Sequence, residues 1–178
     1  MPSKSKTKGS SFEREVSNFL SELYEDSFIR VKDSGAFTGG RNVVRKGSLT
    51  EGQIRAAKGD IVPPDQWRHF NCECKSYKEF PFHQLFSSGP IALLEEWIEQ
   101  TLEAADTGDF NFIIMKFNRK GRYIAYQLEP LGTPFQTIRH LDYIDKNDNV
   151  WRFTSFDDFI GLNTDLFKDT CTGTGHQA

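Results

Sequence analysis

The chain contains, at residues 60–75, the stretch DIVPPDQWRHFNCECK. Its first three residues are typical of a strand, Pro63-Pro64-Asp65 predicts a turn, and the segment from Trp67 to Lys75 predicts a returning strand. Successive side chains of a strand point to opposite faces of its sheet. One face would then be core, and the other would carry four polar side chains: His69, Asn71, Glu73 and Lys75.

Other elements follow from the pattern on either side of this hairpin. Apolar residues at helical spacing predict one helix from Ser10 to about Tyr24 and another from Pro90 to Ala105, which Gly108 ends. Apolar runs predict strands at 28–32, 109–117, 123–128 and 150–153, and Ser155 is placed to cap a short helix through Gly161. This order predicts an α/β fold, a central mixed β-sheet flanked by helices.

Length and composition are those of one globular domain, with 178 residues of which 37% are hydrophobic. We expect a flexible basic arm at residues 1–9, a domain at 10–169 and a disordered tail at 170–178. No apolar run approaches the roughly 20 residues of a membrane helix. No apolar segment follows the N-terminal lysines, as it would in a signal peptide. We therefore expect no membrane partner and a cytoplasmic location.

Charge is distributed unevenly along the chain. The net charge is −3, but residues 1–58 hold 11 Lys and Arg against 7 Asp and Glu, whereas the remainder holds 11 against 18. A local basic surface on an acidic protein can still bind phosphate. The alternative is an ordinary solvated tail and loop, and charge alone does not decide between the two.

The polar strand face is where chemistry is expected. Glu73 and Lys75 point the same way, and hairpin pairing would bring Asp60 close to them. Two carboxylates can hold Mg²⁺, which activates a water and offsets charge on a phosphate, and a nearby lysine can stabilise the transition state. Taken alone, an acid-x-Lys spacing is also common on ordinary surface strands. The cysteines of this strand do not indicate zinc, since no second Cys or His cluster accompanies them.

Glu13 admits two interpretations. Ser10 followed by Glu13 is a capping-box pattern, which needs no catalytic role. On a helical wheel, however, Glu13 falls at the edge of the apolar stripe near Leu20, so its carboxylate would lie along the sheet.

Five stretches, in order, resemble the archaeal-type Holliday junction resolvases of the PD-(D/E)XK nuclease superfamily. They are Lys8–Glu15, Val31–Gly35, Gly59–Val62, Cys72–Ser76 and Ile113–Leu128. The second is similar to a strand and serine/glycine loop, the third to a metal-binding aspartate strand, and the fourth to the acid-x-Lys strand. The resemblance implies a single-domain restriction-endonuclease-like fold, and a compact member of this kind would suit a phage or virus.

The resemblance also implies roles. Glu13, Asp60 and Glu73 would bind Mg²⁺, for which Mn²⁺ would substitute, together with the backbone carbonyl of Cys74. Lys75 would be the catalytic lysine. Arg14, Lys32 and Ser34 would lie near the scissile phosphate, with Ser34 in the catalytic group. The charge pattern adds Lys8, Arg41, Arg45 and Lys46 as DNA-binding residues. The partners would be a four-way DNA junction and a second copy of the chain, with the apolar hairpin at 113–128 as dimer surface or, alternatively, as core.

Two segments depart from the family pattern. Residues 37–58 look like a basic insertion beside the site, and the part beyond about Pro130 has no counterpart. Nuclease chemistry is therefore a firmer prediction than junction specificity. Three alternatives stay open: another PD-(D/E)XK endonuclease of restriction or repair type, a DNA-binding module without catalysis, and a structural protein with a coincidental motif.

Overall fold

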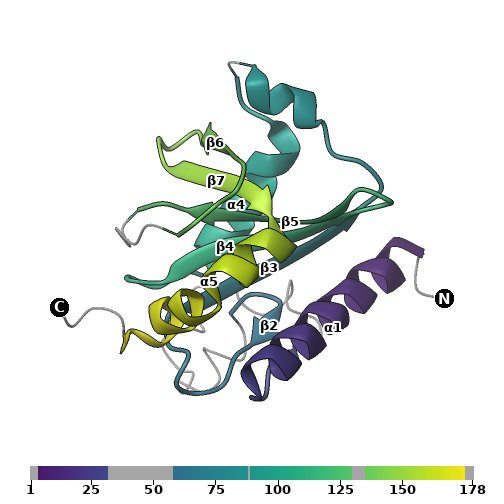
Figure 1. Ribbon diagram of the computed structural model, residues 1–178. Coiled ribbons are helices and arrows are strands. Elements are labelled where there is room, and N and C mark those ends of the chain that lie inside the picture. Colours follow the sequence, from purple (N-terminus) through teal and green to yellow (C-terminus); the bar gives the residue numbers. More distant parts are fainter. Residues whose placement is uncertain (1–3, 32–57, 88, 130–134, 175–178) are drawn as a thin grey trace, which may run out of the picture.

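The computed structural model describes residues 4–31, 58–87, 89–129 and 135–174 (Figure 1). Five of the predicted site residues lie outside these ranges: Lys32, Ser34, Arg41, Arg45 and Lys46. The same holds for most of the predicted insertion. No helix of the described part is long and apolar enough to cross a membrane.

A mixed five-stranded sheet forms the centre of the fold. Its order is β3 (Phe70–Tyr77), β4 (Phe110–Phe117), β5 (Gly121–Gln127), β7 (Val150–Ser155) and β6 (His140–Ile144). β3 runs parallel to β4, and all other neighbours are antiparallel. The predicted α/β class is therefore confirmed, and this architecture is consistent with a restriction-endonuclease-like fold.

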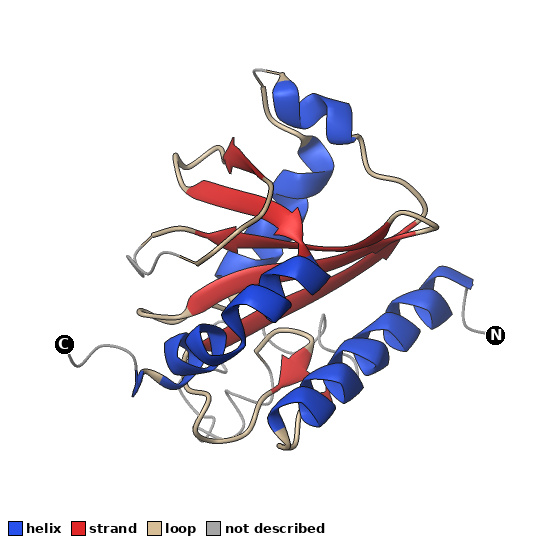
Figure 2. Cartoon of the chain, in the orientation of Figure 1, coloured by secondary structure: helices blue, strands red, loops and turns tan. Residues whose placement is uncertain are grey.

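Helices cover both faces of this sheet, as Figure 2 shows. On one face lie α1 (Lys4–Tyr24) and α5 (Phe156–Thr172), and on the other lies α4 (Ala92–Glu103). Alternation along β4 supplies both cores, since Phe112 and Ile114 pack with α1 and α5 whereas Ile113 and Met115 pack with α4. The predicted hairpin at 113–128 is thus largely core, and the idea that it forms a dimer surface was wrong.

A second, two-stranded sheet lies beside α1. β1 (Ile29–Arg30) pairs antiparallel with β2 (Ile61–Val62). We had expected the strand beginning at Asp60 to pair as a hairpin with the strand at 67–75. Instead its ladder is with β1, and the longer strand starts at Phe70, because the segment from Pro63 to His69 turns away before β3 begins.

Several predicted boundaries differ from the structure. α1 begins at Lys4 and not at Ser10, so residues 4–9 are helical and do not form a separate arm. Its first turns carry no apolar stripe, and hydrophobic periodicity could not detect them. The helix capped by Ser155 runs past Gly161 to Thr172, so Thr170 and Cys171, which we had placed in a disordered tail, are buried residues of α5.

Packing explains the longer α5. Its backbone is non-helical at Asn163, where a regular helix would be interrupted. The side-chain amide of Asn163 donates to the backbone oxygens of Phe159 and Gln136, each at 2.8 Å. Its oxygen accepts from the backbone amide of Gln136, also at 2.8 Å. The second half of the helix then buries Phe167 and Cys171 against the sheet. β6 and the short 3-10 helix η3 (Phe82–Phe86) were not predicted.

Candidate active site

Asp60 lies at the edge of β3 opposite β4, where β3 has no neighbouring strand in the described part of the five-stranded sheet. The backbone carbonyls of His69 and Tyr77 accept hydrogen bonds from the β4 side of the strand. Backbone groups of successive strand residues point to opposite edges, so those of Cys72 and Cys74 point away from β4. There the Asp60 amide donates to the Cys72 carbonyl at 2.9 Å, and the Cys74 amide donates to Oδ2 of Asp60 at 2.8 Å. Asp60 thus reaches the strand through two hydrogen bonds and not through a ladder.

Glu73 and Lys75 share one side of β3, as the two-residue spacing predicted. Nζ of Lys75 lies 2.6 Å from Oε1 of Glu73 and 2.5 Å from Oε1 of Gln100 on α4. The side chain of Glu73 is 15% exposed and that of Lys75 is 13% exposed. An amine and an acid are therefore held together at the edge of the core, with a narrow opening to solvent.

The Glu73 carboxyl lies close to the buried carboxyl of Asp60. Burial raises the pKa of Glu73 from its ordinary value of 4.5 to about 7, and the Asp60 charge acts in the same direction. Lys75 opposes both effects through its charge and its hydrogen bond. Two acids in one poorly solvated place repel each other when ionised, and a cation between them would relieve that repulsion.

Glu13 lies well inside α1, because the helix begins at Lys4. The capping-box interpretation was therefore wrong. Its carboxylate pairs with the guanidinium of Arg30 on β1. Burial raises the pKa of Glu13, the Asp60 charge adds to the rise, and Arg30 and Lys75 counteract it. Glu13 is thus within electrostatic reach of Asp60 and Lys75, although its direct partner is Arg30.

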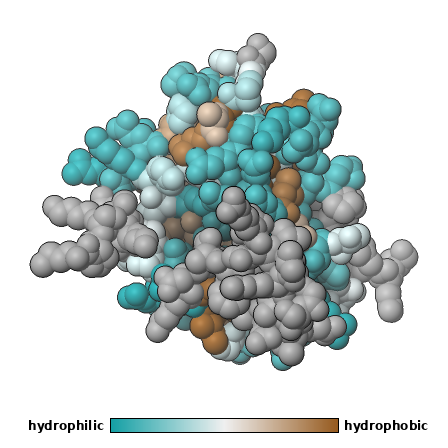
Figure 3. All heavy atoms as spheres, turned by 180° about the vertical axis from the view of Figure 1, so that it is seen from behind, coloured by the Kyte–Doolittle hydropathy of each residue, from teal (hydrophilic) through white to brown (hydrophobic). Residues whose placement is uncertain are grey.

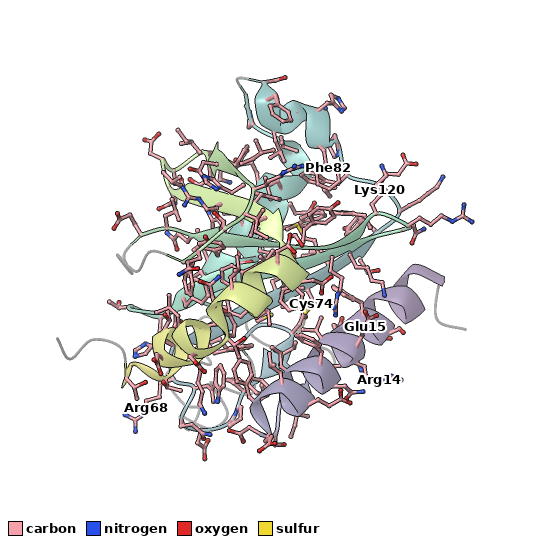
Figure 4. The ribbon with its side chains drawn as sticks, in the orientation of Figure 1. Arg14, Glu15, Arg68, Cys74, Phe82 and Lys120 are labelled. Atoms are coloured by element: carbon pink, nitrogen blue, oxygen red, sulfur yellow. The ribbon has the colours of Figure 1, made fainter. Side chains whose placement is uncertain are left out.

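The remaining predicted residues have different surroundings. Arg14 is exposed on the outer side of α1, whereas its neighbour Glu15 faces the sheet and accepts from Lys116 at 2.6 Å (Figure 4). The carbonyl of Cys74 points, by strand alternation, to the open edge where Asp60 lies. Lys8 belongs to α1, and nothing about its side chain is described.

Arg30 and Gln100 were missed by sequence reasoning. Arg30 lay in a predicted strand, but only the three-dimensional position of α1 brings it to Glu13. Gln100 lies 25 residues from Lys75 in sequence, on a helix whose apolar stripe alone was informative. Neither residue belongs to a local spacing that could have indicated its contact.

Asp60 and Glu73 fit a hard divalent cation. Within the described ranges, no three or more His, Cys, Asp or Glu side chains lie close enough together to hold a metal ion. Mg²⁺, however, is commonly held by one or two carboxylates, with waters and phosphate oxygens completing its coordination. The two repelling acids and the open-edge carbonyl of Cys74 are oxygen donors of this kind. The thiols of Cys72 and Cys74 lie 4.0 Å apart, and burial raises the pKa of both, which disfavours the thiolates that zinc prefers.

A comparison with protein families gives one finding. The family model described as "Phage putative PDDEXK endonuclease" matches residues 4–169. No match was found among curated proteins, and none among solved structures. The matched range includes α1, all strands of both sheets and most of α5, together with Glu13, Asp60, Glu73 and Lys75.

Proposed function

The chain belongs to the phage putative PDDEXK endonuclease family, and from this premise we propose a divalent-metal-dependent DNA endonuclease whose reaction depends on Asp60, Glu73 and Lys75. The family gives the class of reaction, phosphodiester hydrolysis within a nucleic-acid chain. The individual roles, the metal and the form of the DNA are our proposal.

One observation carries the assignment. An acid pair and an amine meet at the free edge of β3, where Lys75 is fixed 2.6 Å from Glu73 and Asp60 is fixed by the Cys74 amide at 2.8 Å. The charges that the reaction needs are thus gathered in one place, where we propose that the scissile phosphate binds.

Each residue would have a defined task. When bound, Mg²⁺ supplies activation of a water and neutralisation of charge on the phosphate, and Mn²⁺ would substitute because it accepts the same oxygen ligands. Asp60 and Glu73 would hold it, with the Cys74 carbonyl as a further oxygen donor. Lys75, oriented by Glu73 and Gln100, would place its ammonium beside the phosphate and stabilise the charge that develops there. Glu13 would join the ligands by loosening its contact with Arg30.

For the substrate we propose four-way DNA junctions. The order of the five stretches that resemble the archaeal-type resolvases supports this choice, and basic residues in the first third of the chain would contact backbone phosphates without reading bases. The alternative is a restriction-like or repair endonuclease that acts on linear duplex. We also propose that the protein acts in the cytoplasm.

Symmetric cleavage of a junction needs two sites, and a two-fold dimer would supply them. Since most of the 113–128 hairpin is core, we propose that the contact uses another surface. Seen from behind, the described surface is largely hydrophilic with small apolar patches (Figure 3). β6 is the last strand in the sheet order, and Ile144 on it and Ile138 just before it are 63% and 66% exposed. We propose this strand edge as the dimer contact.

Cleavage assays test the function directly. A four-way junction, a linear duplex of the same sequence and a single strand are incubated with the protein in Mg²⁺ and in EDTA. We expect metal-dependent cleavage, with paired cuts in the junction, and at least a roughly 100-fold loss in Asp60→Asn with DNA binding retained. Binding without cleavage by the natural sequence would favour the inactive DNA-binding module, and equal cleavage of junction and duplex would favour the alternative endonuclease.

A further inference from the structure

Lys58 is a buried charge outside the proposed catalytic group. Its side chain is 8% exposed, and its ammonium pairs with Asp109, which is 2% exposed, and with Asp106 at 3.1 Å. A buried ammonium is tolerated when it is paired in this way. A buried ion pair is nevertheless a weak stabiliser, because apolar residues of similar volume often serve as well. The position of the Lys58–Asp109 ion pair in the fold therefore suggests a role other than stabilising the fold.

The chain passes directly from Lys58 to the free edge of β3. Gly59 has a φ of +64°, and a side-chain carbon at this residue would overlap the carbonyl oxygen of Cys72. Glycine therefore permits the close approach that both hydrogen bonds of Asp60 to β3 require. Any displacement of residues 58–59 would be transmitted to Asp60, because only one residue separates it from Lys58.

The other end of the ion pair is firmly fixed. Asp109 accepts from the backbone amide of Asp106 at 2.6 Å, within the turn between α4 and β4. The next residue, Phe110, begins β4 and donates its amide to the His69 carbonyl at 2.7 Å. Asp109 is thus tied to the covered side of β3, whereas Lys58 lies beside the open side. The ion pair connects the two sides around the start of the strand.

We propose that Lys58 is a positioning residue for Asp60. The ion pair with Asp109 anchors the backbone at 58–59, and the anchored backbone holds the Asp60 carboxylate against the Cys74 amide at the edge of β3. The positioning of Asp60 by Lys58 follows from contacts within this chain and does not depend on the proposed function. Its consequence for metal binding does rest on the proposed function.

Hydrogen exchange measures the placement without any metal. In Lys58→Met, the amides of Asp60 and Cys74 should lose protection by about 10- to 100-fold more than amides in the middle of β4, which corresponds to losing a hydrogen bond to a charged group. Lys58→Arg, which keeps the charge, should retain the protection. The matched control is Lys146→Met, which removes an exposed ion pair with Glu99 at 3.2 Å and should change neither amide. Should Lys58→Met fail to fold, Asp109→Asn weakens the same pair while Lys58 keeps Asp106 at 3.1 Å as its partner, and it should act in the same direction.

Magnesium titration by calorimetry then tests the metal binding of Asp60 separately from its positioning by Lys58. If Asp60 binds the metal, Lys58→Met should lower Mg²⁺ affinity by about 10- to 100-fold, as removal of a ligand-orienting partner does. If Asp60→Asn binds Mg²⁺ like the natural sequence while the two amides still respond to Lys58→Met, the proposed role of Asp60 fails and its positioning by Lys58 stands. Equal loss of protection at all amides in Lys58→Met, or no loss at Asp60 and Cys74 in either variant, would overturn the inference.

Discussion

Replacing Glu73 by glutamine should make the metal-free protein more stable while abolishing its cleavage of DNA. Glutamine keeps the size of the protonated side chain and cannot ionise. In the natural protein, burial and the charge of Asp60 raise the pKa of Glu73 from 4.5 to about 7, so ionising Glu73 costs more in the folded than in the unfolded state. The variant avoids this cost.

The size of the effect follows from the shift in pKa. Each pKa unit corresponds to about 1.4 kcal/mol, so the rise from 4.5 to about 7 corresponds to at most roughly 3.5 kcal/mol of unfolding free energy. Because the folded-state pKa is raised, the contribution of Glu73 to stability is fully present below about pH 4.5 and is lost as pH rises through about 7. The variant should therefore exceed the natural protein by up to roughly 3.5 kcal/mol at pH 8 and match it near pH 4.5.

Urea unfolding in EDTA at both pH values measures this difference through the midpoint, with an unchanged slope. Glu103→Gln, an exposed glutamate in the last turn of α4, is the matched control and should change stability far less than Glu73→Gln does. Adding Mg²⁺ should raise the stability of the natural protein and not of Glu73→Gln. A variant that is less stable than the natural protein at pH 8 would refute the reasoning, because Glu73 and Lys75 would then be a net stabilising pair.

Further predictions concern the other charged groups. Lys75→Ala should lower kcat by about 100-fold or more with DNA affinity nearly unchanged, as single-turnover rates would show. Glu13→Gln should lose activity with its Tm almost unaltered, and full activity would rule out a metal-ligand role. Ile144→Lys should convert a dimer to a monomer in light scattering, while an unchanged mass would place the contact elsewhere. Neutralising the three basic insertion residues should reduce the salt slope of DNA binding by roughly 0.9 per lost contact; they are Arg41, Arg45 and Lys46.

Elements with strong local patterns were predictable from the sequence. β4 is apolar on both faces because it has neighbours on both sides and helices above and below, so its composition alone indicated a central strand. α1 could be recognised from Phe12 onward, where its apolar stripe begins, but not at Lys4. β6 escaped prediction because Tyr143 is its single buried residue, and its conformation depends on pairing with β7.

The candidate site was likewise predictable only where a local pattern determines the contact. Glu73 and Lys75 are two residues apart on one strand, so strand geometry alone brings their side chains together. Asp60 does lie near Glu73, but not through the hairpin pairing that the sequence predicted. Its strand pairs with β1, and its contact with β3 consists of two isolated hydrogen bonds. Gln100 and Arg30 come from distant parts of the chain. Such contacts depend on how α4 and α1 pack on the sheet, which no local spacing contains.

The free edge of β3 explains why these acids need support from distant residues. An edge strand exposes unpaired amides and carbonyls, and here Asp60 satisfies one of each. The same arrangement brings Asp60 close to Glu73, where the two carboxylates repel. When both acids are ionised, this repulsion favours displacement of the segment at 58–60 from the edge. The Lys58–Asp109 ion pair opposes that movement from one side, and Lys75 offsets the charge of Glu73 from the other. An acid pair that the fold must hold against its own repulsion is already arranged for a cation, and this makes Asp60 and Glu73 stronger metal-site candidates than their spacing in the sequence does.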